Sequence, residues 1–527
     1  MMLNRTTGVS ILQHPIFLAI LFFFLAMGIN LIGIDLLSLT SDECFSIYHA
    51  QMSPRLIYHH LSTGNNPPLH EWILHYWMGW FGDSAFSVRL PSAIFSSLTT
   101  ALIFILGTQI SAGNEKLEKA TGNTSIGGIA ALLFLASNYT TFLAHEARTY
   151  NLTLFLGVLS TICFITAIRS GKTTHFLVYG LIGGLLCLSH FFGIWILLAQ
   201  GSFWLRTNWR NPNALKKMGW AVLGFGIAFG WYVPNLWYRF VDSASQGTWV
   251  NPAPWDAPYF TLWKYLNTPI ATIIAALLLL YLTINLAAKK SIAQKQNAQL
   301  ILWLFALPFF GQWLLSLDHP FSIPMFTERY ASITLPFLCL ILAMALSGLR
   351  EYHNQRLYNF ALALFLSTIL SGKNFTPANQ ASAKEALQTA KVSLGANWGN
   401  PIILEPYHSA FQVLYYADHN RFKQYQFKQH QPHLIYDHLA SQLSHSNIWI
   451  LKTAKSLDSL GLSSESQLTY LRFGTVKSAH TIQIEQQLEK MTNTGGNIKG
   501  ITIQIPKRLW GTTEITSEAE FWLIDRK

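Results

Sequence analysis

Residues 15–37 read PIFLAILFFFLAMGINLIGIDLL, and Asp35 is the only charged residue among these 23 positions. A helix needs about 20 mainly apolar residues to cross a bilayer, so this run is long enough to span one. It is longer than the apolar part of a signal peptide, and no small-residue cleavage site follows it cleanly. We therefore interpret it as a retained membrane anchor.

The composition of the whole chain excludes an ordinary soluble protein. Among 527 residues, 12% are charged, 51% are apolar and 14% are aromatic, with a mean hydropathy of +0.27. An ordinary globular protein has about 25% charged residues, and a chain this apolar cannot cover a soluble surface with polar groups. The net charge of +11 does not indicate nucleic acid, because Lys and Arg occur in short clusters between apolar runs, as in cytoplasmic loops. The four cysteines lack metal-ligand spacing and indicate neither disulfides nor a zinc site.

Apolar runs of spanning character recur up to residue 371, and we predict eleven transmembrane helices. The runs 175–189 and 191–206 are also compatible with one tilted helix, although Ser189, His190 and Gly193 interrupt it. The predicted spans are 15–37, 88–110, 126–143, 150–168, 175–189, 191–206, 218–238, 264–287, 300–317, 331–349 and 356–371.

The segment 68–81 is aromatic but only about 14 residues long, and it contains His70, Glu71 and His75. Such a segment suits the membrane interface, where Trp72, Trp77 and Trp80 would be anchors. The distribution of Lys and Arg agrees with this interpretation, because counting 68–81 as a span would place the basic cluster at 206–217 outside. The positive-inside rule then places the N-terminus inside and the C-terminus outside. The Lys and Arg residues of the predicted inner connections are Arg5, Lys116, Lys119, Arg169, Lys172, Arg206, Arg210, Lys216, Lys217, Lys289, Lys290, Lys295, Arg350 and Arg356.

No further span follows residue 371, so we predict two domains, a membrane domain at 1–371 and an extracytoplasmic α/β domain at 372–527. The second domain is long enough to have its own core. It contains helical patterns at 379–394 and 407–417. Strand-like runs occur at 401–404, 448–451, 500–505 and 520–524.

Ionisable residues are costly in a membrane protein, and here they gather in the predicted outer connections. These connections contain Ser41-Asp42-Glu43, His145–Tyr150, Ser189–Gly193 and Thr327–Tyr330. Each feature also has a structural interpretation: the acidic pair as a helix cap, Arg148 or Arg329 as a snorkelling arginine, His190 as a hydrogen-bonded interior histidine. Their recurrence on one predicted face favours a site. Arg pairs with phosphate oxygens through a planar fork, and a carboxylate can accept a proton from an attacking hydroxyl, which indicates group transfer from a lipid phosphate.

The order of these motifs resembles that of the GT-C polyprenyl-phosphate-sugar glycosyltransferases of family 39, which include protein mannosyltransferases and lipid A aminoarabinose transferases. The resemblance covers roughly residues 15–350. The motifs that carry it are the acidic pair 42–43, Asn-Pro-Pro-Leu (66–69), Phe-Gly-Asp-Ser (81–84), Val-Arg-Leu-Pro-Ser-Ala (88–93), Glu-Ala-Arg-Thr-Tyr (146–150), the His190 turn, and Glu-Arg-Tyr (328–330) followed by Pro336.

The resemblance implies an enzyme of a bacterial inner membrane with its site on the periplasmic side. Asp42 would be the catalytic base, with Glu43 beside it, in an inverting transfer. The donor-binding residues implied are Arg148, Tyr150, His190, Arg329 and Tyr330. The partners implied are a polyprenyl-phosphate-sugar donor and a glycan, lipid or protein acceptor, without nucleic acid. A divalent metal serves some GT-C enzymes; here Glu146 is the only carboxylate near Arg148 in the sequence, which leaves metal dependence open.

Two other classes remain as alternatives. A transporter or flippase of lipid-linked sugars would place ionisable groups near the midplane and often shows repeated halves, neither of which the sequence has. An oligosaccharide polymerase or ligase would have its chemistry in one long late loop, whereas the acidic pair here lies in the first. A family member without activity that serves as an assembly factor is a third interpretation.

Overall fold

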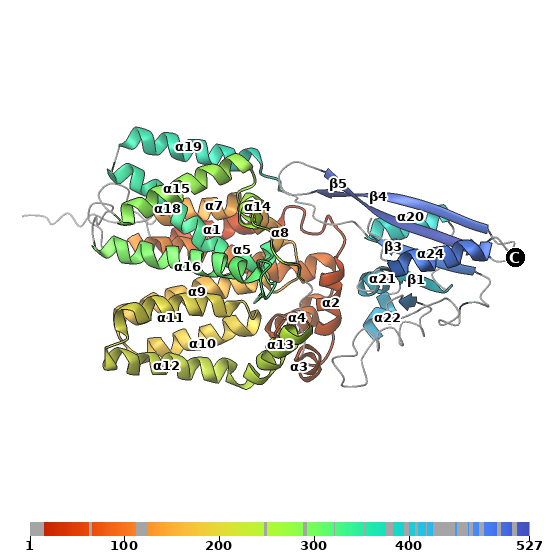
Figure 1. Ribbon diagram of the computed structural model, residues 1–527, viewed down its shortest axis with the longest axis horizontal. Coiled ribbons are helices and arrows are strands. Elements are labelled where there is room, and N and C mark those ends of the chain that lie inside the picture. The colour runs from red at the N-terminus through yellow and green to blue at the C-terminus, as the bar shows by residue number, and fades with distance from the viewer. Residues whose placement is uncertain are drawn as a thin grey trace, which may run out of the picture. The chain divides into compact units, whose positions relative to one another are not determined.

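Figure 1 shows a computed structural model of the chain, in which contacts define two compact units. The first unit comprises Met1–Ile34, Asn65–His70 and Arg89–Pro377, and the second comprises Asp35–Gly64, Glu71–Val88 and Ala378–Lys527. Most of the predicted first outer connection therefore groups with the C-terminal residues, while the predicted domain boundary at 371/372 stays a prediction. The structure describes residues 15–62, 66–111, 125–246, 250–287, 292–320, 322–352, 354–375, 383–394, 400–405, 409–417, 419–424, 448–450, 462, 467–473, 479–492, 497–508 and 514–525.

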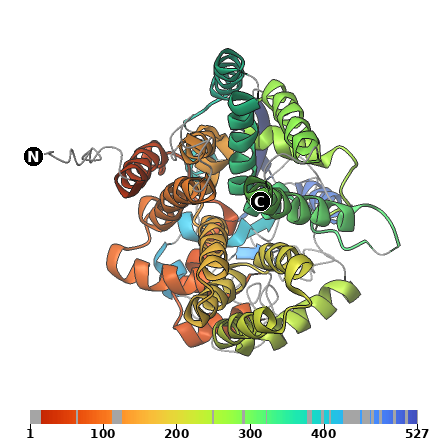
Figure 2. The same ribbon diagram turned by 90° about the vertical axis from the view of Figure 1, so that its left-hand side faces the viewer.

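The first unit is a bundle of helices, which Figure 2 shows nearly end-on. Every predicted span coincides with one helix or with a succession of two or three helices. The helices are α1 (Pro15–Leu31), α5 (Ala85–Ser111), α7 (Ser125–Ala136), α8 (Asn138–Ala144), α9 (Tyr150–Ser170), α10 (Thr173–Ser189), α11 (Gly193–Asn208), α12 (Pro212–Phe229), η2 (Gly230–Tyr232), α13 (Val233–Gln246), α14 (Ala257–Leu266), α15 (Pro269–Ala287), α16 (Ile292–Ser316), α17 (Glu328–Ala331), η3 (Ser332–Thr334), α18 (Leu335–Tyr352) and α19 (Gln355–Ser371).

Helix α18 lies at the centre of this bundle and is buried along most of its length. Phe337, Leu340 and Leu346 are fully buried, and α18 packs against α7, α15, α16 and α19. Small residues let other helices approach closely, as is usual in membranes. A Cβ at Gly180 of α10 would lie 1.9 Å from the carbonyl oxygen of Ala221 on α12, so only glycine fits at this crossing.

Five of the described helices are long and apolar enough to cross a membrane, and a bent pair provides a sixth candidate. The chain is thus a multi-pass membrane protein by its apolar helices, but the predicted number of eleven spans is not confirmed. Most of the other predicted spans form helices of fewer than 18 residues, such as α1 and α10, and two runs contain a break that hydropathy does not reveal. The run 126–143 bends by 69° between α7 and α8. The run 264–287 is divided at Asn267, which has a positive φ of 67°.

The segment 68–81 forms α4 (Leu69–Phe81), a 13-residue helix that is not among the candidate spans.

A hydrogen-bonded cluster supports the bend between α7 and α8. The side chain of Asn267 accepts a hydrogen bond from the Asn138 backbone N–H (2.7 Å) and donates to the carbonyl of Ala136 (2.7 Å). Asn138 donates to Gly372 O (2.7 Å), and Lys373 donates to Thr141 Oγ1 (2.8 Å). Because buried backbone groups must be paired, these side chains make the break tolerable. Because residues 145–149 directly follow α8, the bend determines their position in the unit.

The second unit contains α2 (Ser41–Ala50), α3 (Pro54–Leu61), most of α4 and the C-terminal residues. The five strands among its described residues form one mixed sheet in the order β2-β1-β3-β5-β4, in which β1 is parallel to β2 and β3, and β5 is antiparallel to β3 and β4. The C-terminal elements are α20 (Ala383–Leu394), β1 (Ile402–Glu405), α21 (Ala410–Ala417), α22 (His419–Gln424), β2 (Ile448–Ile450), β3 (Gln467–Phe473), α24 (Ala479–Thr492), β4 (Asn497–Arg508) and β5 (Glu514–Asp525).

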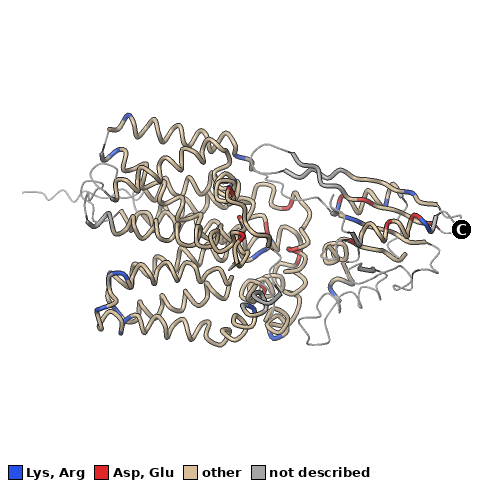
Figure 3. Tube along the Cα trace, in the orientation of Figure 1, with Lys and Arg blue, Asp and Glu red and all other residues tan. Residues whose placement is uncertain are grey.

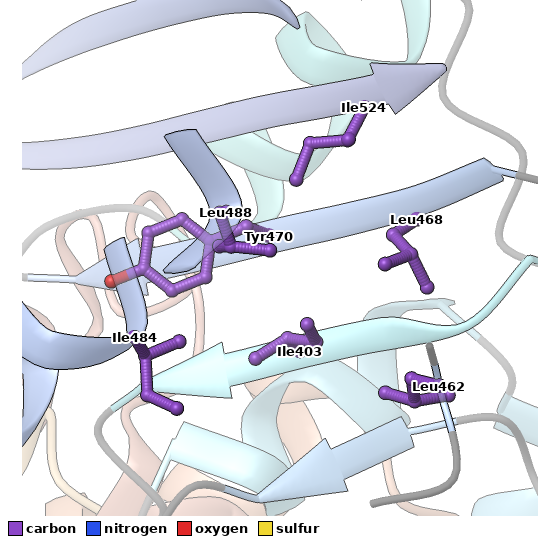
Figure 4. Close-up of a cluster of buried hydrophobic side chains, with 7 residues drawn as sticks. All are labelled: Ile403, Leu462, Leu468, Tyr470, Ile484, Leu488 and Ile524. Atoms are coloured by element: carbon purple, nitrogen blue, oxygen red, sulfur yellow. The ribbon is translucent and has the colours of Figure 1, made fainter. Parts of the chain in front are cut away.

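The core of this sheet confirms the predicted α/β character. Figure 4 shows its buried side chains, with Tyr470 of β3 between residues of the other strands and of α24. Strand β3 and helix α24 were not predicted, although both contribute to this core. The cluster consists of Ile403, Leu462, Leu468, Tyr470, Ile484, Leu488 and Ile524.

Candidate functional site

Two hydrogen bonds in the first unit join the start of α9 to the end of α10. The hydroxyl of Thr149 donates to the carbonyl of Ser189 (2.7 Å), and the hydroxyls of Thr153 and Ser189 lie 3.1 Å apart. Thr149 follows Arg148, and Ser189 precedes His190. These bonds therefore bring two predicted outer motifs together at one end of the bundle.

A small pocket at this end contains four of the predicted donor-binding residues. The ring of Tyr330 stacks on Phe192 at 4.5 Å and lies 5.2 Å from the ring of His190. The ring of Tyr150, at the start of α9, lies 6.0 Å from the ring of His190, which follows α10. The pocket is lined by Tyr150, Thr153, Leu154, His190, Phe192, Arg329, Tyr330, Ser332 and Ile333.

Arg329 of the pocket is paired with a carboxylate that was not predicted to belong to the site. Arg329 Nη2 lies 3.2 Å from Glu146 Oε1, and the Glu146 side chain is only 3% exposed against 21% for Arg329. Arg148 is buried as well. The neighbouring Glu328 pairs instead with Lys264 at 2.7 Å. A buried carboxylate orients Arg329, so its guanidinium is held in place before any anion binds.

His190 is a neutral hydrogen-bond donor in this arrangement. Its Nδ1 accepts a hydrogen bond from the backbone N–H of Phe192 (3.1 Å), so the proton of the neutral ring is on Nε2. Burial, together with the positive charge of Arg148, lowers the pKa of His190 to about 3. Nε2 is buried and has no hydrogen-bond partner among the residues that the structure describes. An N–H group in this state is suited to donate to a ligand oxygen.

The charges of the first unit lie at its two ends, as Figure 3 shows. Basic residues occur where α9 ends, at Arg169, and around the turn between α11 and α12, at Arg206 and Arg210. The pocket lies at the opposite ends of the same helices, where α9 begins and α10 ends. This separation is the one that the positive-inside argument requires.

Asp42 and Glu43 belong to the second unit and have different environments. Thr40 is the N-cap of α2; its side chain accepts from the Glu43 N–H, and the Glu43 carboxylate accepts from the Thr40 N–H at 2.8 Å. This is a complete capping box, so the helix-cap role falls to Thr40 and Glu43. Glu43 is fully buried, whereas Asp42 is exposed. Their approach to the pocket of the first unit stays a prediction.

Among the described residues, no group of three His, Cys, Asp or Glu side chains is placed to hold a metal ion. The described polar groups at the pocket include the Arg329 guanidinium, which is paired with Glu146, and the imidazole of His190. A guanidinium and an imidazole N–H are suited to bind anionic oxygen.

Comparisons with known proteins bear on the fold of the chain. The family described as dolichyl-phosphate-mannose-protein mannosyltransferase matches residues 65–238. The crystal structure of ArnT from Cupriavidus metallidurans in the apo state has a TM-score of 0.52 and 10% sequence identity, covering 95% of this chain and 97% of that one. The chain has the GT-C glycosyltransferase fold. ArnT from the same organism bound to undecaprenyl phosphate has a TM-score of 0.51 and 12% identity, with the same coverage of 95% and 97%. No curated protein sequence matches the chain.

The GT-C fold confirms the resemblance and the predicted fold class, a helical membrane protein with a C-terminal sheet. The structure brings Tyr150, His190, Arg329 and Tyr330 together and places Arg148 close enough to lower the pKa of His190. The roles of these residues stay predictions. Glu146 was missed as a site residue because nothing in the sequence reveals a contact with a residue 183 positions away.

Proposed function

We propose that this chain is an integral membrane glycosyltransferase that transfers a sugar from a polyprenyl-phosphate donor to an acceptor at the outer membrane face. The observation that carries the proposal is the combination of Arg329 and the neutral His190 N–H at one pocket of a GT-C fold, with the positive charge of Arg148 near His190. A lipid phosphate has the oxygens and the charge that these donors complement. ArnT has been crystallised with undecaprenyl phosphate, which supports this class of donor.

The proposed reaction is a single displacement. A hydroxyl oxygen or amine nitrogen of the acceptor attacks the anomeric carbon, and its proton passes to Asp42. The bond from that carbon to the phosphate oxygen breaks, and polyprenyl phosphate leaves with the electron pair, so the configuration inverts. The leaving phosphate gains charge, and Arg329 and Arg148 then stabilise the transition state more than the ground state.

The proposed setting is a bacterial inner membrane with the pocket on the periplasmic side, because the basic turns at the other end of the bundle would be retained in the cytoplasm. The acceptor would be a glycolipid, a cell-wall polymer or a protein.

The test is mass spectrometry of surface glycolipids and glycoproteins in a deletion strain complemented with wild-type or Asp42→Asn protein. We expect one sugar modification to disappear and only the wild type to restore it. An unchanged envelope, or full restoration by Asp42→Asn, would contradict the proposal.

The membrane orientation can be tested with reporter fusions. We expect fusions after Lys119 and Lys290 to be cytoplasmic, and fusions at Asn65 and after Gly372 to be external, because basic residues remain inside. The sites Lys119, Lys290 and Asn65 lie outside the described residues. External location of both the Asn65 and the Lys119 fusion would refute the predicted number of spans.

The proposed role of His190 predicts a difference between two substitutions. His190→Gln keeps an N–H donor near the position of Nε2, whereas His190→Asn keeps only the group that accepts from Phe192. A hydrogen bond to a charged group contributes about 1.5–3 kcal/mol, so we expect His190→Asn to weaken binding of undecaprenyl phosphate by about 10- to 100-fold and His190→Gln by much less. Because the pKa is about 3, neither substitution should change the pH profile between about pH 5 and 8. Equal affinities of the two variants would exclude the Nε2–H donor.

A further inference from the structure

Helix α21 of the C-terminal segment makes hydrogen bonds with both backbone groups of Leu39, the carbonyl and the N–H. Gln412 Nε2 donates to the Leu39 carbonyl (2.6 Å), and the Leu39 N–H donates to the hydroxyl of Tyr416 (2.5 Å). Gln412 and Tyr416 are four positions apart and so lie on the same face of the helix. Leu39 is fully buried, so its backbone groups must find partners within the protein. Two side chains from about 375 positions later in the chain supply them.

The residue held in this way directly precedes the N-terminus of α2. Leu39 is followed by Thr40, the N-cap, and Asp42 lies in the first turn of the helix. The same α21 also packs along α2, because the Phe411 ring lies 5.5 Å from Phe45 and 4.9 Å from Tyr48. Both the cap and one face of α2 are thus held by α21. A helix held at its cap and its side cannot rotate, so the direction of the Asp42 Cα–Cβ bond is determined as well.

A second attachment holds the far end of the same connection. The hydroxyl of Tyr415 donates to the Asp83 carbonyl (2.9 Å), and the Asp83 carboxylate lies 3.1 Å from His419 and 3.4 Å from Lys423 of α22. Lys423 is half exposed, so its ion pair contributes little stability. The bonds at Asp83 therefore attach the end of the first connection to α21 and α22, far along the chain from Asp42. The bonds at Leu39 are the ones close to Asp42, only three residues before it.

We propose that Gln412 and Tyr416 are positioning residues for Asp42, so that the C-terminal segment orders the residue that accepts the acceptor's proton. This inference rests on the proposed function. Asp42 is the exposed member of an acidic pair whose other member is fixed in the capping box. A displacement of about 1 Å in a reacting group can lower the rate by about 10²-fold. The hydrogen bonds to Leu39 therefore act on the rate through the position of Asp42.

The test compares Tyr416→Phe with Tyr415→Phe in the full-length protein. Both substitutions remove one hydroxyl from α21, but only the first releases Leu39. The assay follows release of undecaprenyl phosphate from undecaprenyl-phosphate-linked sugars, with lipid and protein extracts of the deletion strain as acceptors. We expect Tyr416→Phe to lower kcat by about 10- to 100-fold with KM for the donor unchanged, and Tyr415→Phe to change kcat by less than about threefold. Gln412→Met, which removes the other bond to Leu39, should behave like Tyr416→Phe.

The Asp42→Asn background separates positioning from general destabilisation. Residues that act through one group are non-additive, so Tyr416→Phe should not lower the residual rate of Asp42→Asn any further. An equal loss in both backgrounds, or wild-type kcat in both Tyr416→Phe and Gln412→Met, would overturn the inference. Full activity of Asp42→Asn itself would instead refute the base assignment in the proposed function. The two failures are therefore distinguishable.

Discussion

Asp42→Asn is expected to lower kcat for sugar transfer by about 10²- to 10⁴-fold, which is the usual contribution of a positioned acid–base group. The substitution keeps the size and hydrogen-bonding shape of the side chain but removes its ability to take a proton. Binding of undecaprenyl phosphate should be retained, because the pocket with Arg329 and His190 belongs to the other unit. Steady-state kinetics and donor binding on the same preparation check both parts of this prediction.

Glu43 supplies the matched control. Its carboxylate accepts from the Thr40 N–H in the capping box, and a glutamine serves the same role. Glu43→Gln should therefore change the rate little, whereas Glu43→Ala should lower stability by about 0.5–2 kcal/mol through loss of the cap. Full transfer activity in Asp42→Asn with an inactive Glu43→Gln would move the base to Glu43. Full activity in both variants would refute the acid–base assignment.

Arg329→Ala is expected to lower kcat/KM by about 10²- to 10³-fold, comparable with the loss of a donor that stabilises transition-state charge. Arg329→Lys keeps the charge but loses the planar fork, so its activity should be intermediate. Affinity for undecaprenyl phosphate should decrease in the same order. Wild-type kinetics for the lipid-linked donor in Arg329→Ala would remove this arginine from the site.

The interpretation of Arg329→Ala requires a control for the buried carboxylate that it leaves behind. Glu146 pairs with Arg329 at 3.2 Å, and removing one partner of a buried pair can cost about 3–5 kcal/mol of stability. Combining Arg329→Ala with Glu146→Gln removes both charges. We expect the double variant to regain stability, measured by thermal unfolding in detergent, but not activity. Recovery of activity with stability would show that Arg329 serves only the fold.

The positions of the helices and the class of the protein were predictable from local sequence. Lipid requires about 20 apolar residues in succession for every spanning helix, so the signal is contained in each run. The predicted spans accordingly coincide with helices, and the acidic pair lies at the start of α2 as a helix-capping pattern predicts. The number of spans was not predictable in the same way. Most of the unconfirmed spans form helices of fewer than 18 residues, and the bend at Ser137 depends on a side chain from a distant helix. Hydropathy averages over such breaks.

The sequence by itself determined that this is a membrane protein with a GT-C motif order, and it nominated Asp42, Arg148, His190 and Arg329. Only the tertiary structure decided which polar groups meet. Glu146 and Arg329 are 183 residues apart, and Leu39 is bonded to Gln412 across 373 residues. Helical or strand periodicity describes neighbours within one element and carries no information about partners in another. The proton on His190 Nε2 likewise follows from the backbone N–H of Phe192 and from burial beside Arg148, which exist only once the helices have packed.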